Sequence, residues 1–394
     1  MRASSAISAG LNLAVLAGVI LAAVVVPETP REDKTLVDRT VRKFNAMRRI
    51  SGGREEETEG YYEDLFQSSR RSVAISAVVS GQWAAKWTTW EFKQVQESTM
   101  KRRSDFLYFE LLPHLDVREV DGRLVTNSFG MADREYPTTR QAGFRRCAFI
   151  GDSMTRGLGS SPGANYESLL EDSLTAMGPN PEYQGYEFLN FGVEAYRLTQ
   201  MVEVVRTKAA EFSPDCYIVV LSDLSVARKW ADHIWQLVND GIDLQYDFLK
   251  DVVKRAGLRA GDDAVALESR LAPYRPEILR WALGSIQAMA ARQNAEVVVI
   301  LVPNVSDQVA LAESFRGMSD LTRSLGLATV DLLDTFAGIQ NLTPYKVPRT
   351  GDSHPSDKGH RLLFERLLSR IQANPQAWQV FTGVREANGS GPGF

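Results

Sequence analysis

From about residue 143 onward, short apolar runs alternate regularly with amphipathic segments. The apolar runs predict five strands, at residues 145–150, 186–192, 214–223, 295–303 and 327–333. Apolar positions at helical spacing predict helices near residues 166–174, 199–212, 309–325 and 356–371. Strands that are apolar without alternation, interleaved with helices, indicate an α/β domain in which helices cover both faces of a parallel sheet.

The N-terminal part of the chain shows a different pattern. Residues 11–26, LNLAVLAGVILAAVVV, are almost wholly apolar, and no charged side chain lies between Arg2 and Glu28. About 20 such residues cross a bilayer as a helix. A cleaved signal peptide usually ends in small residues, whereas this run ends in three valines and a proline. The pattern therefore favours an uncleaved transmembrane anchor in residues 1–30 over a signal segment, with the bulk of the protein outside the cytoplasm.

The remaining sequence divides into regions by composition. Residues 31–104 are predicted to form a helical stalk or lead-in, and residues 105–375 the main domain. Within that domain, residues 225–263 are long for a connection and are interpreted as an insertion, possibly a lid over the functional edge. Residues 376–394 are expected to be a C-terminal tail.

Composition narrows the class of protein. The 394 residues are 44% apolar, and 45 basic side chains face 49 acidic ones, so no basic excess points to nucleic acid. Cys147 and Cys216 each begin an apolar run, where a free cysteine behaves as a small buried hydrophobe. We favour that interpretation and leave a disulfide or a reactive thiol as alternatives. Neither cysteine has the spacing of a metal site, and no cofactor motif is present.

Polar residues with catalytic potential follow the predicted strands. Ser153 follows the first strand, Asn190 and Gly192 end the second, and Ser222 ends the third. The carboxyl ends of parallel strands meet at one edge of the sheet, so these groups are expected to lie close together. Alone, Ser153 could equally be a helix cap.

A histidine in a polar turn supplies the missing base. His354 lies in GDSHPSDKGH, two residues after Asp352. A hydroxyl needs a base to become a nucleophile, and a carboxylate can orient the imidazole of that base. Ser153, His354 and Asp352 therefore form a candidate triad. His114, His233 and His360 are interpreted as packing or surface residues.

The ordered blocks GDS, N-x-G, a strand-end Asp and D…HP…GH resemble the SGNH/GDSL hydrolase superfamily. The upstream TNSFGMADREYP resembles the lead-in of a bacterial branch of that superfamily, and the match spans about residues 106–371. The resemblance implies a flavodoxin-like three-layer α/β/α sandwich and metal-free ester hydrolysis without a cofactor. It also implies Ser153 as nucleophile, His354 as base and the Gly192 backbone N–H as an oxyanion donor.

Three departures from the family pattern stand out. Ser222 occupies the position of an oxyanion-binding Asn, which leaves Asn190 as a candidate substitute, although a structural hydrogen bond suits Asn190 better. Asp352 precedes the histidine by two residues instead of the usual three, as in SGNH-type polysaccharide O-acetyltransferases. Ala132 stands where the branch has Arg.

Two further residues of the lead-in and one of the serine block have structural interpretations. Asn127 and Asp133 are expected to brace the lead-in loop against the functional edge. Asp152 is expected to bond backbone N–H groups in the turn before Ser153 instead of acting in catalysis.

The sequence thus predicts a membrane-anchored, extracytoplasmic serine esterase acting on an acylated small molecule or cell-surface glycan. Two alternatives stay open: an SGNH-type O-acyltransferase, and a catalytically inactive SGNH-fold binding module.

Overall fold

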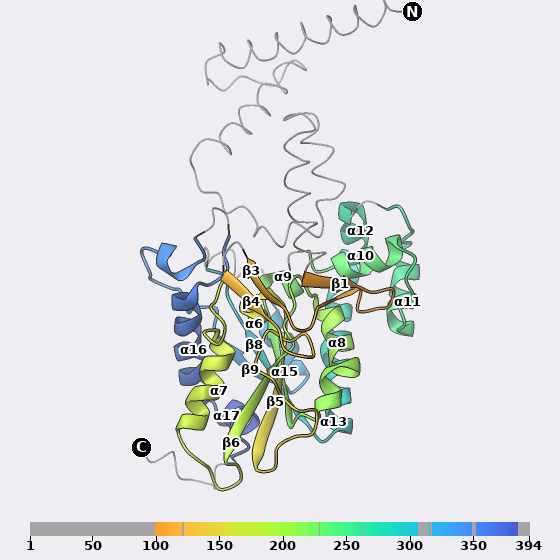
Figure 1. The fold of residues 1–394 in the computed structure, drawn as a ribbon. Coiled ribbons are helices and arrows are strands. Elements are labelled where there is room, and N and C mark those ends of the chain that lie inside the picture. Colours follow the sequence, from red (N-terminus) through yellow and green to blue (C-terminus); the bar gives the residue numbers. More distant parts are fainter. Residues whose placement is uncertain are drawn as a thin grey trace, which may run out of the picture. The chain divides into compact units, whose positions relative to one another are not determined.

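The computed structural model describes residues 99–119, 122–227, 229–262, 264–305, 315, 317–348 and 352–384 (Figure 1). The predicted anchor in residues 1–30 and almost all of the lead-in lie outside the described residues. Among the described helices, none combines the length and apolar character that a bilayer crossing requires.

Five parallel strands form the central sheet, in the order β6-β5-β7-β8-β9. They are β5 (Phe144–Ile150), β6 (Gly185–Asn190), β7 (Cys216–Leu221), β8 (Glu296–Leu301) and β9 (Ala328–Asp331). Each coincides with one of the predicted strands, and the prediction of a parallel sheet is confirmed. The order is that of flavodoxin-like sheets, in which the first and second strands exchange places.

Helices cover both faces of this sheet (Figure 1). One face packs against α7 (Tyr166–Ala176), α16 (Asp357–Gln372) and α17 (Pro375–Thr382). The other packs against α8 (Leu198–Thr207), α13 (Arg275–Arg292) and α15 (Met318–Ser324). Strand side chains alternate between these two apolar layers, so Phe149 belongs to the first and Ala148 and Ile150 to the second. Both layers are apolar, which is why the strands lack a polar face.

The segment predicted as an insertion, residues 225–263, is largely helical. It contains the end of α9 (Asp223–Val226), α10 (Asp232–Asn239) and α11 (Asp247–Arg255), and α12 (Ala264–Leu271) follows it. Trp230, Leu237 and Leu249 are buried in the same apolar layer as α8. The segment is therefore packed into the domain, and its action as a lid stays a prediction.

The two ends of the described chain differ from the predicted domain boundaries. Residues 100–104 were expected in the helical lead-in, but Met100–Arg102 form β1, paired antiparallel with β2 (Phe109–Leu111). A second hairpin joins β3 (Asp116–Glu119) and β4 (Gly122–Val125). Residues 376–382 are not a tail, because α17 buries Ala377, Val380 and Phe381 against the sheet at helical spacing. Short 3₁₀ turns complete the described elements, at Ala209–Phe212, Ala272–Tyr274 and Thr343–Tyr345.

Cys147 and Cys216 are joined in a disulfide. The favoured interpretation as free cysteines is therefore wrong, although both side chains are fully buried as expected. The reason lies in the register: β5 and β7 are neighbours, and Cys147 pairs directly with Cys216, with their Cα atoms 4.7 Å apart. A sequence that places each cysteine at the start of a strand does not reveal which strands are adjacent.

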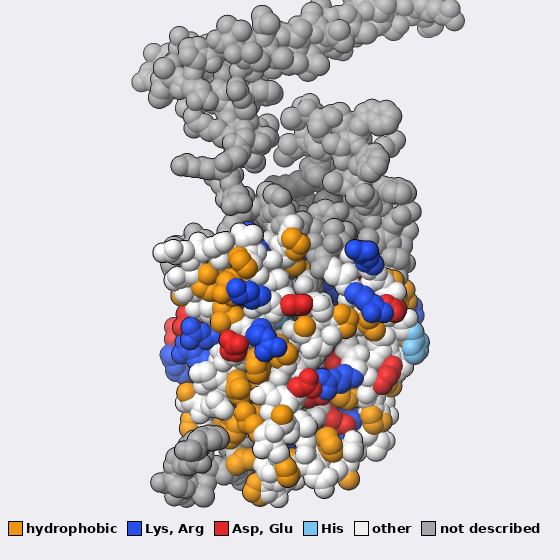
Figure 2. Space-filling model, turned by 60° about the vertical axis from the view of Figure 1, so that its left-hand side comes forward, with side chains coloured by type: hydrophobic (Ala, Val, Ile, Leu, Met, Phe, Trp, Pro, Cys, Tyr) orange, Lys and Arg blue, Asp and Glu red, His pale blue; other side chains and the backbone are white. Residues whose placement is uncertain are grey.

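Charged side chains are mixed on the surface. On the face seen in Figure 2, lysines and arginines are interspersed with aspartates and glutamates.

Candidate active site

The candidate nucleophile lies in a tight turn at the carboxyl end of β5. Asp152 caps the short helix α6 (Ser153–Arg156), because its Oδ1 accepts the Met154 N–H at 3.0 Å. The expected structural role of Asp152 is thereby confirmed. A Cβ at Gly151 would lie 1.9 Å from Thr155 Oγ1, so the turn needs glycine at this position. Ser153 is thus the first residue of a helix held rigidly against the strand.

The candidate base lies in the turn that leads into α16. The N–H of Val347 donates to the His354 carbonyl at 3.0 Å, and the N–H of Val305 donates to Ser353 O at 2.8 Å, which fixes this turn against the end of the sheet. Ser356 caps α16 with its hydroxyl. His354 is therefore held by backbone bonds from two other segments.

The structure brings the three predicted triad residues together. His354 Nε2 lies 2.8 Å from Ser153 Oγ, although 201 residues separate them. His354 Nδ1 lies 2.6 Å from Asp352 Oδ1, which also accepts the His354 backbone N–H at 2.9 Å. A hydroxyl, an imidazole and a carboxylate in this order can pass a proton from the hydroxyl to the imidazole and stabilise the imidazolium that forms.

The backbone at Gly192 packs closely on α6, and its N–H is already hydrogen-bonded within the turn. Its N–H donates to Asn190 Oδ1 at 3.0 Å. A Cβ here would lie 2.3 Å from the backbone nitrogen of Arg156, so the missing side chain lets the β6 turn pack directly on α6. In this structure the Gly192 N–H is therefore directed at Asn190.

Asn190 links the two turns. Its Nδ2 donates to the Thr155 carbonyl at 2.7 Å and lies 3.2 Å from Glu167 Oε2, while its Oδ1 holds the Gly192 N–H. The first two contacts bind the end of β6 to α6 and α7, and the third closes the turn after β6. The side chain is thus engaged in structure, as its block position suggested.

Ser222 is likewise engaged. Its hydroxyl donates to Asp152 Oδ2, and its backbone N–H donates to the Ser225 hydroxyl oxygen at 2.9 Å. The side chain thus ties the end of β7 to the cap of α6. Ser222 stands behind the nucleophile turn rather than directing its hydroxyl at a substrate.

Two other backbone N–H groups, of Ser153 itself and of a residue in the turn after β6, are candidate donors. Among the described residues, no acceptor is found for the N–H of Ser153 or of Ala195. Ala195, in the turn after β6, has φ of 60°, a left-handed conformation that non-glycine residues rarely adopt and that often marks a functional site. The sequence analysis missed Ala195, since nothing in an alanine reports its backbone angle.

A buried carboxylate–guanidinium–carboxylate group adjoins the triad. Arg156, at the end of α6, bonds Glu119 at 3.0 Å and Glu194 at 2.6 Å, and all three side chains are at most 7% exposed. Burial and the neighbouring Glu119 raise the pKa of Glu194, whereas Arg156 and His354 act in the opposite direction. The sequence analysis missed this group because its members come from three separate segments.

A second acidic group braces the lead-in loop. Asp133 Oδ2 accepts the Asn190 N–H at 2.9 Å, and Asn127 Nδ2 donates to the Arg134 carbonyl at 2.8 Å, which confirms the expected bracing roles. Burial and the nearby Glu171 raise the pKa of Asp133 to about 8. Burial and Asp133 also raise the pKa of Glu167 well above its usual range.

Two other histidines are structural, as expected. His233 is held between Thr199 Oγ1 and the Phe106 carbonyl, and burial lowers its pKa to about 3. His360 stacks on Tyr166, and burial lowers its pKa to about 4. Within the described ranges, no three His, Cys, Asp or Glu side chains form a group suited to a metal ion.

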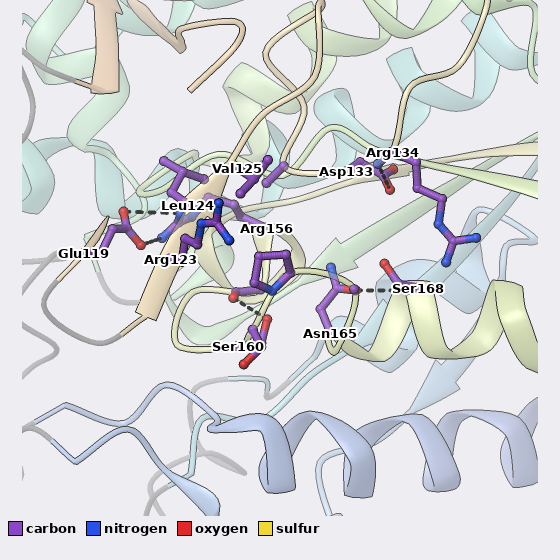
Figure 3. Close-up of a pocket in the computed structure, with 15 residues that line it drawn as sticks. Glu119, Arg123, Leu124, Val125, Asp133, Arg134, Arg156, Ser160, Asn165 and Ser168 are labelled. Carbon is purple, nitrogen blue, oxygen red and sulfur yellow. Dashed lines mark hydrogen bonds and ion pairs between the residues drawn. The ribbon is translucent and has the colours of Figure 1, made fainter. Parts of the chain in front are cut away.

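A cavity of about 240 Å³ lies beside α6 (Figure 3). Arg156 and Gly157 form part of its wall, together with the β3–β4 hairpin, the lead-in loop around Asp133 and the residues before α7. Ser153 and His354 are not among its lining residues.

No family model and no curated protein matches this chain. Solved structures do resemble it. A G-D-S-L family lipolytic protein from Desulfitobacterium hafniense is 12% identical with a TM-score of 0.37, covering 57% of this chain and 98% of its own. A lipase/acylhydrolase from Enterococcus faecalis is 12% identical with a TM-score of 0.36, covering 58% and 95%. A catalytic mutant of Axe2, an acetylxylan esterase from Geobacillus stearothermophilus, is 13% identical with a TM-score of 0.39, covering 59% and 95%. The proteins to which the chain is similar in structure thus include one of the G-D-S-L family, whose sequence blocks it resembles.

Proposed function

We propose that this protein is an SGNH-type serine esterase that works through an acyl-enzyme. The observation that carries the proposal is the pair of distances at His354, 2.8 Å to Ser153 Oγ and 2.6 Å to Asp352 Oδ1. Both lie within the range that proton transfer by a positioned base requires.

The reaction follows from these contacts. His354 Nε2 takes the Ser153 hydroxyl proton as Oγ attacks the ester carbonyl carbon. The carbonyl oxygen then carries a negative charge, which the N–H groups of Ser153 and Ala195 would stabilise. The tetrahedral intermediate collapses, and the alcohol leaves with the proton from His354. Water, deprotonated by the same imidazole, hydrolyses the acyl-enzyme and restores the Ser153 hydroxyl.

The acceptor of the acyl group distinguishes an esterase from the first alternative, an O-acyltransferase. If a sugar hydroxyl replaces water in the second half of the reaction, the same residues catalyse O-acyl transfer. The two-residue spacing of Asp352 and His354, which resembles that of SGNH-type O-acetyltransferases, supports this alternative. The triad distances weigh against an inactive binding module, which has no need of a hydrogen-bonded serine and histidine.

We further propose that the protein is membrane-anchored and extracytoplasmic. The apolar run at residues 11–26 supports the anchor. The Cys147–Cys216 disulfide supports an oxidising compartment, because disulfides persist there and are rare in the cytosol. In such a location, an O-acylated glycan of the cell surface is the substrate we favour.

A fluorophosphonate probe tests the esterase directly. We expect covalent labelling of the purified protein and hydrolysis of p-nitrophenyl acetate, with both abolished in Ser153→Ala and retained in Ser173→Ala, a serine of α7. Folded protein that neither reacts with the probe nor hydrolyses the ester would support the binding module. An acetylated glycan acceptor formed at the expense of free acetate would support the acyltransferase.

A further inference from the structure

The cavity beside α6 lies close to the candidate nucleophile. Arg156 lines it and is three residues from Ser153 in the same helix. At 1.5 Å per residue, this separation is roughly 4.5 Å along the helix axis. The cavity therefore shares a wall with the short helix that begins at Ser153.

Every arginine of the cavity wall is paired with a carboxylate. Arg123 bonds Asp116 at 2.7 Å, Arg134 bonds Glu171 and Asp172 at 2.7 Å each, and Arg156 bonds Glu119 and Glu194. Figure 3 shows Glu119 and Arg123 on one side of the cavity and Arg134 on the other, above Ser168. Since each arginine is already paired, the described wall presents no unpaired guanidinium that would attract an anion.

The wall nevertheless presents many hydrogen-bonding groups. Guanidinium groups and the Asn165 amide can donate, and the hydroxyls of Ser160 and Ser168 can donate or accept. Asp133 also lines the cavity, and its two carboxyl oxygens accept the backbone N–H groups of Arg134 and Asn190. The apolar part is limited to a few small or medium side chains, Leu124, Val125, Ala132 and Pro162. Such a wall suits a neutral ligand rich in hydroxyl groups and does not suit a long acyl chain.

The size of the cavity agrees with one such unit. Its volume of about 240 Å³ falls below the roughly 300–1,000 Å³ of pockets for drug-sized ligands. It exceeds the roughly 30 Å³ share of a single water molecule several-fold. There is space for one small ring and its hydroxyl groups.

We propose that this cavity is a subsite for the alcohol side of the ester and binds a sugar unit of an O-acylated glycan. The proposal rests on the proposed esterase function. Ala132 lines the cavity on the lead-in side, where a large side chain would take up its space.

Filling the cavity tests the proposal. Purified Ala132→Trp is compared with Ala291→Trp, at an exposed position of α13, on acetylated xylotriose and on p-nitrophenyl acetate, which lacks a sugar. We expect Ala132→Trp to lower kcat/KM for acetylated xylotriose at least tenfold more than for p-nitrophenyl acetate, and Ala291→Trp to change neither. Equal losses on both substrates, or no loss on either, would overturn the subsite.

Two further measurements separate the possible failures. If circular dichroism shows that Ala132→Trp is unfolded, Val125→Trp fills the cavity from a second lining position, in β4, and is held to the same criterion. If the unmodified protein neither hydrolyses p-nitrophenyl acetate nor reacts with a fluorophosphonate, the esterase proposal fails by itself. Calorimetric binding of xylotriose to the unmodified chain then decides the subsite: binding that Val125→Trp abolishes supports it, and no binding overturns it.

Discussion

The turns after β5 and β6 lie side by side at the same edge of the sheet, yet they use their polar groups in opposite ways. The β5 turn directs Ser153 outward to His354 and leaves the Ser153 N–H without an acceptor in the described structure. The β6 turn directs Asn190 and the Gly192 N–H toward each other and toward α6. A residue at a strand end is therefore a candidate for chemistry only if its hydrogen bonds are not already used in holding the neighbouring turn.

The helix that begins with Ser153, the candidate nucleophile, is fixed by contacts from several strand ends. Asp152 caps α6, Ser222 bonds Asp152, and Asn190 holds the Thr155 carbonyl. Three strands thus contribute to fixing one short helix. Preorganisation of this kind lowers the reorganisation that the reaction requires.

The largest expected effect comes from the carboxylate of the triad. Asp352→Asn should lower kcat for p-nitrophenyl acetate by about 10⁴-fold, the loss seen when a comparable aspartate is replaced, because the wrong imidazole tautomer is then favoured. Fluorophosphonate labelling should slow in parallel. Asp334→Asn, which removes an exposed partner of Arg370, should leave both rates unchanged. A loss below tenfold in Asp352→Asn would remove Asp352 from the triad.

Ser222→Ala distinguishes a supporting serine from an oxyanion donor. Removing its bond to Asp152 should reduce the free energy of unfolding by about 1–3 kcal/mol, since a buried carboxylate loses a partner. Urea denaturation measures this change. The rate should fall less than tenfold, whereas loss of an oxyanion donor costs about 10²–10³-fold. A rate loss in that higher range with unchanged stability would restore Ser222 to the oxyanion site.

Protonation of Asp133 should make the free energy of unfolding depend on pH. Its pKa is raised from 3.8 to about 8, so the folded protein binds more protons than the unfolded chain between these values. The stabilisation that comes from protonated Asp133 is fully present below about pH 4. It is lost as the pH rises toward 8, by at most about 1.4 kcal/mol of unfolding free energy per pH unit. Urea denaturation from pH 5 to 8 should show a smaller decline in Asp133→Asn than in the unmodified protein. Asp320→Asn, which removes one partner of an exposed ion pair, should show the same decline as the unmodified protein. If Asp133 were ionised over this whole pH range, Asp133→Asn would show that decline too.

The smallest expected effect is at Ala195. Glycine adopts a φ of 60° without the steric cost that alanine bears, but it also gains more freedom in the unfolded chain. Ala195→Gly should therefore raise the free energy of unfolding by no more than about 1 kcal/mol. Ala291→Gly, in the regular helix α13, should instead lower it by about 1 kcal/mol. Equal destabilisation of the two variants would contradict the left-handed conformation of Ala195.

The parts of the fold and the site that the sequence predicts are those that leave a local signature. The five strands are mainly apolar runs, although β5 contains two arginines. The pairing of Ser153 with His354 follows from the ordered sequence blocks in which the two residues lie. The strands of the hairpins β1–β2 and β3–β4 are only three or four residues long, too short for an alternating pattern to stand out, so they escape detection. The disulfide and the Glu119–Arg156–Glu194 group depend on which segments become neighbours. The direction of the Gly192 N–H depends on the conformation of a single turn.

The distance along the chain between Ser153 and His354 has a consequence for folding. The two residues are 201 positions apart, and the segment between them forms four of the five strands of the sheet. Contacts between such distant residues form slowly, because the intervening chain must be ordered first. The serine can acquire its base only once the turn before α16 has docked, near the end of the domain. Reactivity of Ser153 should therefore be the last property to return on refolding, after the helical content has been recovered.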